Sequence, residues 1–194
     1  VCHLYPLLIS HCCCLHNLFL SSFCYIDFTS LTTFAHNNDS VTHSQDFRAI
    51  VSEFIEGKTL TELIEENPSD KDKYLELLVD LQLEVQSKTN PLLTKLKDKM
   101  NRKISLTELD ATVKYDLFTR LESMPKHNKL CHGDFNTSNV IIAKDGTPYI
   151  LDWAHATQGN ASADAARTYL FFCLNEDMDG AKKYLELFCK KSDT

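Results

Sequence analysis

Basic side chains are scarce in this sequence. Its 194 residues contain 20 Lys and Arg against 27 Asp and Glu, which gives a formal net charge of −7, and the basic residues form no long patch. This balance disfavours nucleic-acid binding, which depends on neutralising the phosphate backbone. The acidic excess would suit a cationic substrate or Mg²⁺, although a solvated acidic surface explains it more simply.

Lys and Arg are absent altogether from the first 45 residues, which differ in kind from the rest. A secretory signal needs a positively charged start. A membrane span would not carry His11, His16 and Asn17 in the middle of its apolar run. We interpret residues 1–45 as an atypical, cysteine-rich apolar leader, disordered or misassigned, with a single-pass anchor as the alternative. Otherwise we expect no membrane partner.

A readable cysteine framework is lacking too. Five of the eight cysteines lie before residue 25, three of them consecutive, and they fit neither a zinc knuckle nor a disulfide pattern. A metal site with the neighbouring histidines is the alternative there. Cys131, Cys173 and Cys189 lie in apolar contexts, where a free thiol packs as a small hydrophobe. We therefore expect a reduced, cytoplasmic protein.

Ordinary strand and helix patterns begin near Asp46. The run FRAIVSEFIEG predicts a strand that ends in a turn at Gly57. Thr59, followed by an acidic first turn, predicts the start of a short helix, and residues 69–87 predict an amphipathic one. After a smaller helix, Ser105 with Glu108 forms a capping box that predicts the start of another long helix.

A β-hairpin is predicted next. The segment NVIIAKDGTPYILDW has two apolar runs around Asp145-Gly146, a pair suited to a tight turn. Asn139 then begins the first strand and Asp152 ends the second. Residues 162–174 and 180–190 predict two further helices. The first helix places these residues on one side: Ala165, Ala166, Tyr169, Leu170 and Cys173.

Polar residues are concentrated in the segment LCHGDFNTSNVII, residues 130–142. Because a hairpin brings its two ends together, Asn139 and Asp152 are expected to be neighbours, and Asp134 can point into the same space. Two carboxylates and an amide oxygen are hard ligands suited to Mg²⁺. Any one of these residues is more often a turn or capping residue, but their joint spacing is the one that a phosphoryl-transfer site needs.

HGDFNTSN followed by ILDW resembles the paired motifs of the aminoglycoside phosphotransferase and choline kinase families, relatives of the protein kinases. The resemblance covers roughly residues 47–190. It implies an α+β fold, a protein-kinase-like C-terminal lobe that is mostly helical with a small β-hairpin carrying the catalytic and metal motifs. It also implies an enzyme that uses Mg²⁺ and ATP to transfer the γ-phosphate to a hydroxyl of a small molecule, such as an aminoglycoside or choline.

The resemblance also assigns roles to residues. Asp134 would accept the proton of the attacking hydroxyl or orient it, while Asn139 and Asp152 would bind Mg²⁺. An interlobe hinge would contact the adenine of ATP through Glu53, Phe54 and Ile55.

Three residues would support the site without taking part in the chemistry. His132 is expected to be a packed loop residue that bonds backbone groups, and Gly133 belongs to the same loop. Asp164 would brace this loop from a helix start, with a plain helix-capping acid as the alternative.

The sequence departs from the family on the amino-terminal side. Its first lysine is Lys58 and its first glycine is Gly57, so no upstream lysine or glycine-rich cover is available for phosphate binding. We interpret residues 46–58 as the last strand of the amino-terminal lobe with the hinge, and residues 59–194 as a helical lobe truncated at its C-terminus. The alternatives are a catalytically inactive kinase-like fragment or binding module, and a metallohydrolase using His132, Asp134 and Asp152.

Overall fold

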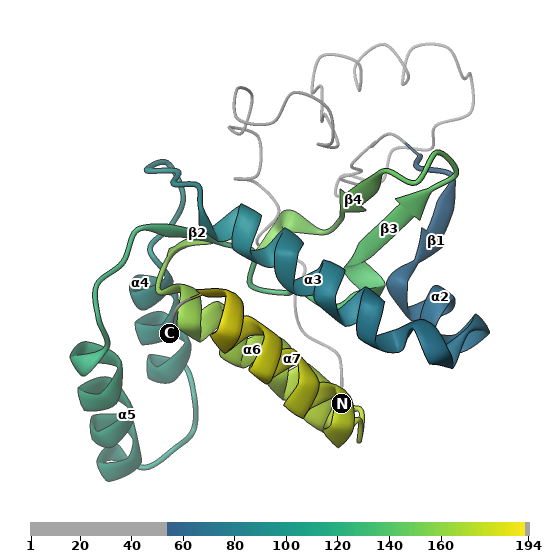
Figure 1. Cartoon of the computed structure of the whole chain (residues 1–194). Helices are drawn as coiled ribbons and strands as arrows, with labels where there is room; N and C mark the ends of the chain where they lie inside the picture. The colour runs from purple at the N-terminus through teal and green to yellow at the C-terminus, as the bar shows by residue number, and fades with distance from the viewer. Residues whose placement is uncertain (1–53, 193–194) are drawn as a thin grey trace, which may run out of the picture.

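The computed structural model describes residues 54–192 (Figure 1). The predicted leader, residues 1–45, and the hinge residue Glu53 lie outside this range. In chain order the elements are β1 (Gly57–Thr59), α2 (Leu60–Glu66), η1 (Pro68–Asp70), α3 (Lys71–Gln86), α4 (Leu96–Ser105), α5 (Ala111–Ser123), β2 (Lys129–Cys131), η2 (Thr137–Asn139), β3 (Val140–Ala143), β4 (Pro148–Ile150), η3 (Trp153–His155), β5 (Thr157–Gly159), α6 (Ala161–Leu174) and α7 (Met178–Ser192).

Strand β3 is the centre of a three-stranded antiparallel sheet with the order β1-β3-β4. The predicted hairpin is confirmed, since β3 pairs with β4 and Val140 lies opposite Ile150. The Asp145 side chain accepts a hydrogen bond from the Thr147 N–H at 2.9 Å, and Gly146 has a φ of +87°, a conformation that favours glycine. The turn residues therefore set the register of the hairpin.

The prediction that Gly57 ends a strand is wrong, because a strand begins there. Strand β1 pairs with β3 and places Gly57 opposite Ala143. A Cβ atom at Gly57 would lie 2.3 Å from the carbonyl oxygen of Ile142, so glycine is needed for the close approach of the two backbones. The strand predicted before Gly57 falls largely outside the described residues, and residues 54–56 are not in a strand.

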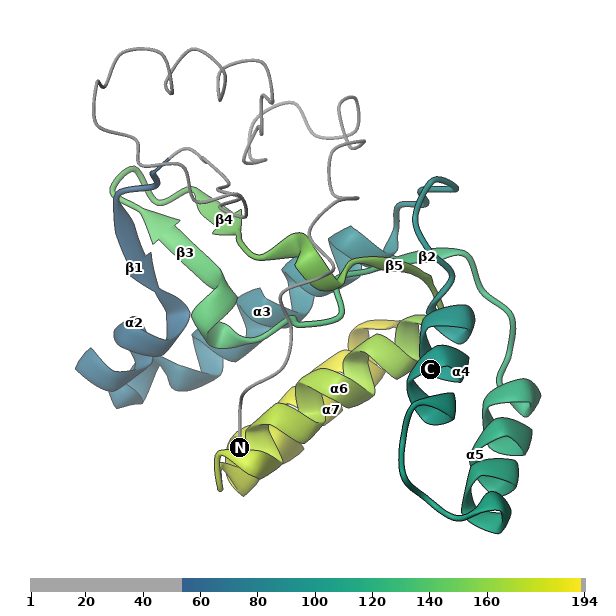
Figure 2. The ribbon, with the colours of Figure 1, turned by 180° about the vertical axis from the view of Figure 1, so that it is seen from behind.

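The helices form a layer beside the sheet. Helix α3 passes the three-stranded sheet and runs on toward β2 and β5, with α6 and α7 side by side along it (Figure 1). Strands β2 and β5 form a second, two-stranded antiparallel sheet. Seen from behind, the helix pair α4 and α5 lies at the opposite end of the molecule from the three-stranded sheet (Figure 2). The architecture is thus mixed helix and sheet, as predicted.

The core lies between the sheet and helices α3, α6 and α7. The predicted amphipathic helix at residues 69–87 is confirmed as α3, but its buried face includes Gln82 and Gln86 beside the apolar residues. The Gln82 side chain accepts from the Tyr184 hydroxyl and donates to Thr168 at 3.2 Å. The buried apolar residues are Leu60, Leu75, Leu78, Val79, Val85, Leu130, Phe135, Val140, Ala165, Phe172, Ala181, Tyr184 and Phe188.

The capping box at Ser105 and Glu108 is wrong. Ser105 ends α4, and its hydroxyl donates to the Asn101 carbonyl oxygen at 2.9 Å. Helix α5 begins later, where the Asp110 carboxylate accepts from two main-chain N–H groups. Aspartate is among the preferred N-cap residues because its short side chain reaches the N–H groups of the first turn directly. By contrast the Thr59 start is confirmed, with a capping box between Thr59 and Glu62 in α2.

The face predicted for the helix at residues 162–174 is also partly wrong. Helix α6 is present, but its buried side chains are Asp164, Ala165, Thr168 and Phe172, whereas Leu170 is 52% exposed. The apolar pattern does not reveal the buried face of α6, because this face contains two polar residues, Asp164 and Thr168, that hydrogen-bond to the segment after β2. Burial of polar groups is tolerated where such bonds are made.

Two further expectations concern the cellular environment. No helix within residues 54–192 is long and apolar enough to cross a membrane. Cys131, Cys173 and Cys189 are free thiols. The cytoplasmic location stays a prediction.

Candidate active site

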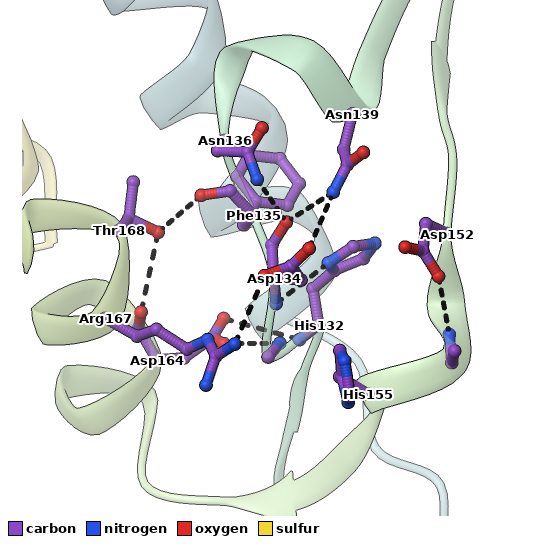
Figure 3. Close-up of polar contacts among 12 residues, drawn as sticks. His132, Asp134, Phe135, Asn136, Asn139, Asp152, His155, Asp164, Arg167 and Thr168 are labelled. Atoms are coloured by element: carbon purple, nitrogen blue, oxygen red, sulfur yellow. Dashed lines mark hydrogen bonds and ion pairs between the residues drawn. The ribbon is translucent and has the colours of Figure 1, made fainter. Parts of the chain in front are cut away.

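Residues 132–139 form a loop, here called the polar loop, that connects β2 to β3 (Figure 3). Near its start Gly133 has a φ of +78°. A Cβ atom at this position would lie 2.6 Å from the His155 carbonyl oxygen. Glycine satisfies both the backbone angle and the close contact, so the polar loop lies directly against η3, the turn that follows the hairpin.

Asp164, in the first turn of α6, holds the start of the polar loop. Its carboxylate accepts from the Gly133 N–H at 2.7 Å and from the His132 N–H at 3.3 Å. Two buried glutamine amides of α3 also donate to it at 3.3 Å each. The N-cap of α6 is Asn160, whose side chain accepts from the Ser162 N–H at 2.8 Å. This geometry supports a brace rather than a plain helix-capping acid.

His132 is fully buried, and both its ring nitrogens have backbone partners. Its Nδ1 accepts from the Asp134 N–H at 3.3 Å, so Nε2 carries the proton and donates to the Leu151 carbonyl oxygen at 2.9 Å. Burial lowers the pKa of His132, opposed mainly by the negative charge of Asp164. The neutral ring ties the polar loop to the end of the hairpin and has no free nitrogen for a metal ion.

Asp134 lies at the centre of the polar loop. Its Oδ2 accepts from the side-chain amide of Asn139 at 3.0 Å, and the same amide donates to the Asp134 main-chain oxygen at 2.8 Å. Oδ1 faces the other way and accepts from Arg167 at 3.2 Å. Figure 3 shows the Asp134 carboxylate between Arg167 on one side and Asn139 with Asp152 on the other.

The hairpin brings Asn139 and Asp152 together from its two ends. The Leu151 N–H donates to the Asn139 carbonyl oxygen at 2.8 Å, one step beyond the last paired residues of β3 and β4. One oxygen of Asp152 accepts from the Ala154 N–H at 3.4 Å, and the other points toward the polar loop (Figure 3). The amide nitrogen of Asn139 is turned to Asp134, and its oxygen faces the segment after β4 that carries Asp152 (Figure 3).

The donor set of Asn139 and Asp152 suits a magnesium ion shared with a substrate. Within the described residues no group of three or more His, Cys, Asp or Glu side chains could hold a metal. One carboxylate and one amide oxygen are hard ligands, and Mg²⁺ commonly takes its remaining ligands from water and substrate phosphates. Asp152 has a φ of 55°, a left-handed conformation that is costly for most residues and is concentrated at functional sites.

The expected hinge residues lie at the other end of the hairpin. Phe54 and Ile55 precede β1, and the Phe54 side chain is 86% exposed. The main-chain oxygen of Glu56 accepts from the Lys144 N–H at 3.3 Å, next to the hairpin turn. These residues are therefore separated from Asn139 by the length of β3.

Three residues near Asp134 were not singled out from the sequence. Arg167 forms an ion pair with Asp134, and Lys99 of α4 donates to the His155 carbonyl oxygen at 3.0 Å. Burial first, and then the charges of Lys99 and Arg167, lower the pKa of His155. Arg167 lies one helical turn after Asp164, a spacing that places both on one face. Nothing in the sequence indicated that Lys99 would lie nearby.

Comparison with known proteins gives the context for this geometry. Residues 34–193 match the model of the phosphotransferase enzyme family. A thermostable mutant of aminoglycoside phosphotransferase APH(4)-Ia is similar in its apo form, with a TM-score of 0.52 and 17% identity over 73% of this chain and 56% of that chain. Its ternary complex with ADP and hygromycin B has a TM-score of 0.52 and 19% identity over 73% of this chain and 55% of that chain.

Choline kinase LicA from Streptococcus pneumoniae is a third similar structure, with a TM-score of 0.46 and 19% identity over 72% of this chain and 51% of that chain. No curated protein sequence matches this chain significantly. The chain spans little more than half the length of the solved proteins that it resembles.

The family match covers most of the chain, and the similarity to the APH(4)-Ia structures covers 73% of it. The expected protein-kinase-like fold is thereby confirmed. The chain belongs to the phosphotransferase enzyme family.

Proposed function

We propose that this protein transfers the γ-phosphate of ATP, with Mg²⁺, to a hydroxyl of a small molecule. The observation that carries this proposal is the position of Asp134, whose carboxylate is hydrogen-bonded to Asn139 at 3.0 Å beside the hairpin end that carries Asp152. A base for the acceptor hydroxyl and two oxygen ligands for the metal are the parts that phosphoryl transfer needs.

Asp134 is proposed to accept or orient the proton of the attacking hydroxyl. Arg167 and Asn139 both bond its carboxylate, which holds the group that would act as the base in one orientation. Asn139 and Asp152 would hold Mg²⁺. When bound, this ion would neutralise charge on the nucleotide phosphates during transfer.

The hairpin offers a path for the nucleotide between the hinge and the metal residues. Phe54 and Ile55 lie near the hairpin turn, and Asn139 lies at the opposite end of β3, which has four residues. At a rise of about 3.3 Å per residue, this strand spans roughly 13 Å. An extended nucleoside triphosphate could place its base near the hinge and its phosphates near Asn139. A contact between adenine and Glu53, Phe54 or Ile55 belongs to this proposal.

A second candidate is a binding module that holds a nucleotide without transferring phosphate. It is favoured by Lys58, the first lysine within residues 54–192, which is paired with Glu66 at 2.6 Å, because phosphoryl transfer in related folds uses a lysine on the nucleotide phosphates. The two candidates predict the same metal pair and differ only in turnover.

Nucleotide binding and ADP formation by the whole chain test the proposal. We expect Mg²⁺-dependent ATP binding that is lost in Asp152→Ala, since the only carboxylate of the metal pair is removed. We expect Asp134→Asn to bind ATP nearly normally but to lower turnover by about 100-fold or more, because a base acts mainly on the chemical step. Asp179→Asn, an exposed residue of α7, is the matched control.

Two outcomes separate the alternatives. Mg²⁺-dependent binding without ADP formation, over a range of hydroxyl acceptors, would favour the binding module. ATP binding that is indifferent to both Mg²⁺ and Asp152→Ala would contradict the metal assignment and with it the phosphotransferase proposal.

A further inference from the structure

A small pocket lies next to the polar loop and is lined in part by Arg167, which bonds Asp134 on the oxygen not used by Asn139. It is lined by residues of α4 and α6 together with Gly133 and His155, and has a volume of about 40 Å³. A cavity needs roughly 10–15 Å³ of this kind to hold one water molecule, so the space suits one small functional group rather than a whole substrate.

Three cationic side chains line this pocket. Lys99 and Lys103 lie one turn apart on α4, and Arg167 faces them from α6. Neither lysine forms an ion pair with a carboxylate within residues 54–192. Lys99 donates instead to the His155 carbonyl oxygen. Positive charge is therefore gathered here in a chain whose formal net charge is −7.

This gathering of charge is unfavourable in the free protein. Burial lowers the pKa of Lys99, and the positive charges of Lys103 and Arg167 lower it further. The Nε atom of Arg167 is buried and lacks a hydrogen-bond partner within the described residues, although its terminal nitrogen bonds Asp134. An anion in the pocket would relieve the repulsion and supply the missing acceptor.

The acidic groups nearby do not neutralise the pocket. Asp164 also lines it, but its carboxylate is committed to the polar loop and to the α3 glutamines. Asp134 balances only Arg167. The positive charges of Lys99 and Lys103 therefore have no carboxylate partner within residues 54–192 and are available to an anionic ligand.

We propose that this pocket binds an oxyanion group, a carboxylate or a phosphate ester, on the acceptor, and that the acceptor is an anionic hydroxyl compound. The proposal rests on the proposed phosphotransferase function. Arg167, which lines the pocket, and Asn139 of the metal pair bond different oxygens of the Asp134 carboxylate (Figure 3). In an in-line transfer the acceptor and the departing nucleotide lie on opposite sides of the moving phosphate. An acceptor anchored by Lys99, Lys103 and Arg167 would have its hydroxyl at Asp134, while cationic acceptors such as choline and the aminoglycosides would be repelled.

Binding of inorganic phosphate and of acetate to the whole chain, measured by calorimetry without nucleotide, tests the pocket independently of turnover. We expect saturable binding of at least one anion, weakened about tenfold or more in Lys103→Gln and in Lys99→Gln. Arg102→Gln is the matched control, since Arg102 is exposed, is next to Lys103 in α4, and is absent from the pocket. It removes the same charge and should leave binding within about twofold.

Lys103→Gln is the cleaner variant, because Lys99 also bonds η3. Equal effects of Lys103→Gln and Arg102→Gln on anion binding would indicate a general charge effect and would overturn the proposal that the anion binds in the pocket. So would the absence of binding of either anion. Binding of phosphate alone would indicate a phosphate ester, and binding of acetate a carboxylate.

A panel of acceptors then tests the substrate class, with ADP release from Mg-ATP as the readout. Glycerate and glycerol 3-phosphate represent anionic acceptors, glycerol a neutral one and choline a cationic one. ADP release with an anionic compound that falls about tenfold or more in Lys103→Gln supports the proposal. Release with choline only would overturn it and leave the phosphotransferase function standing. Release with no compound, together with intact anion binding, would count against the phosphotransferase function but not the anion pocket.

Discussion

The side-chain amide of Asn139 donates to two oxygens of Asp134, the main-chain oxygen at 2.8 Å and Oδ2 at 3.0 Å. Asn139, the residue just before β3, is thus fixed to the centre of the polar loop by its side-chain nitrogen, and its side-chain oxygen stays available on the side of Asp152 (Figure 3). One side chain therefore links the proposed base to the proposed metal pair.

The substitution Asn139→Asp tests the contribution of these hydrogen bonds to stability. The change replaces a donor by a second carboxylate beside Asp134, so two hydrogen bonds are lost and like charges face each other. We expect the free energy of unfolding in urea to fall by about 1–3 kcal/mol. Asn128→Asp, at an exposed position before β2, should change it by less than about 0.5 kcal/mol. Added Mg²⁺ should restore part of the loss, and equal stability of the two variants would refute the link.

Asp164→Asn should weaken the brace of the polar loop. The carboxylate accepts four hydrogen bonds while the residue is only 4% exposed, and a neutral amide cannot accept all of them. We expect a loss of about 2–4 kcal/mol in the free energy of unfolding. The exposed Asp179→Asn is the control. A change as small as that of the control would mean that the loop does not depend on Asp164.

Gly133→Ala tests the close approach of the polar loop to η3. A Cβ atom would meet the His155 carbonyl oxygen at 2.6 Å, and φ is +78°. Gly146→Ala has a similar φ of +87° but open space around it, so it measures the backbone cost alone, about 1 kcal/mol. Thermal and urea unfolding should show Gly133→Ala to be the more destabilising change. The reverse order would contradict the packing of the polar loop against η3.

His132 should make stability depend on pH. Its pKa in the folded protein lies below the ordinary value of 6.5 because of burial, so the unfolded chain binds the proton more readily. The stabilisation from the neutral ring is complete above about pH 6.5 and is lost as the pH falls toward the folded pKa, by at most about 1.4 kcal/mol per pH unit.

The measurement is the free energy of unfolding between pH 7.5 and pH 5 for the wild type and for His132→Gln. The variant should be less stable at every pH but should show a shallower decline toward acid, while the other histidines titrate in both proteins. Parallel pH profiles would show that His132 does not titrate as described.

Much of the site was predicted because its parts are set by neighbours in the chain. The hairpin depends on Asp145 and Gly146 in its own turn, and once it forms, Asn139 and Asp152 must lie at adjacent ends. The start of α2 is equally local, since Thr59 and Glu62 bond each other. The start of α5 was mispredicted because two rival caps, Ser105 and Asp110, lie close together, and only the end of α4 selects between them.

By itself, the sequence determined the motifs, the hairpin and the residues that end up at its two ends, because turn chemistry and strand pairing act over a few residues. Only the tertiary structure decided which side chains from distant parts of the sequence lie around Asp134. Arg167 reaches it across 33 positions, and Lys99 reaches η3 across 56, because α4 and α6 pack on either side of one pocket. Periodicity along a helix shows which residues share a face, but only the packing of helices shows what that face meets.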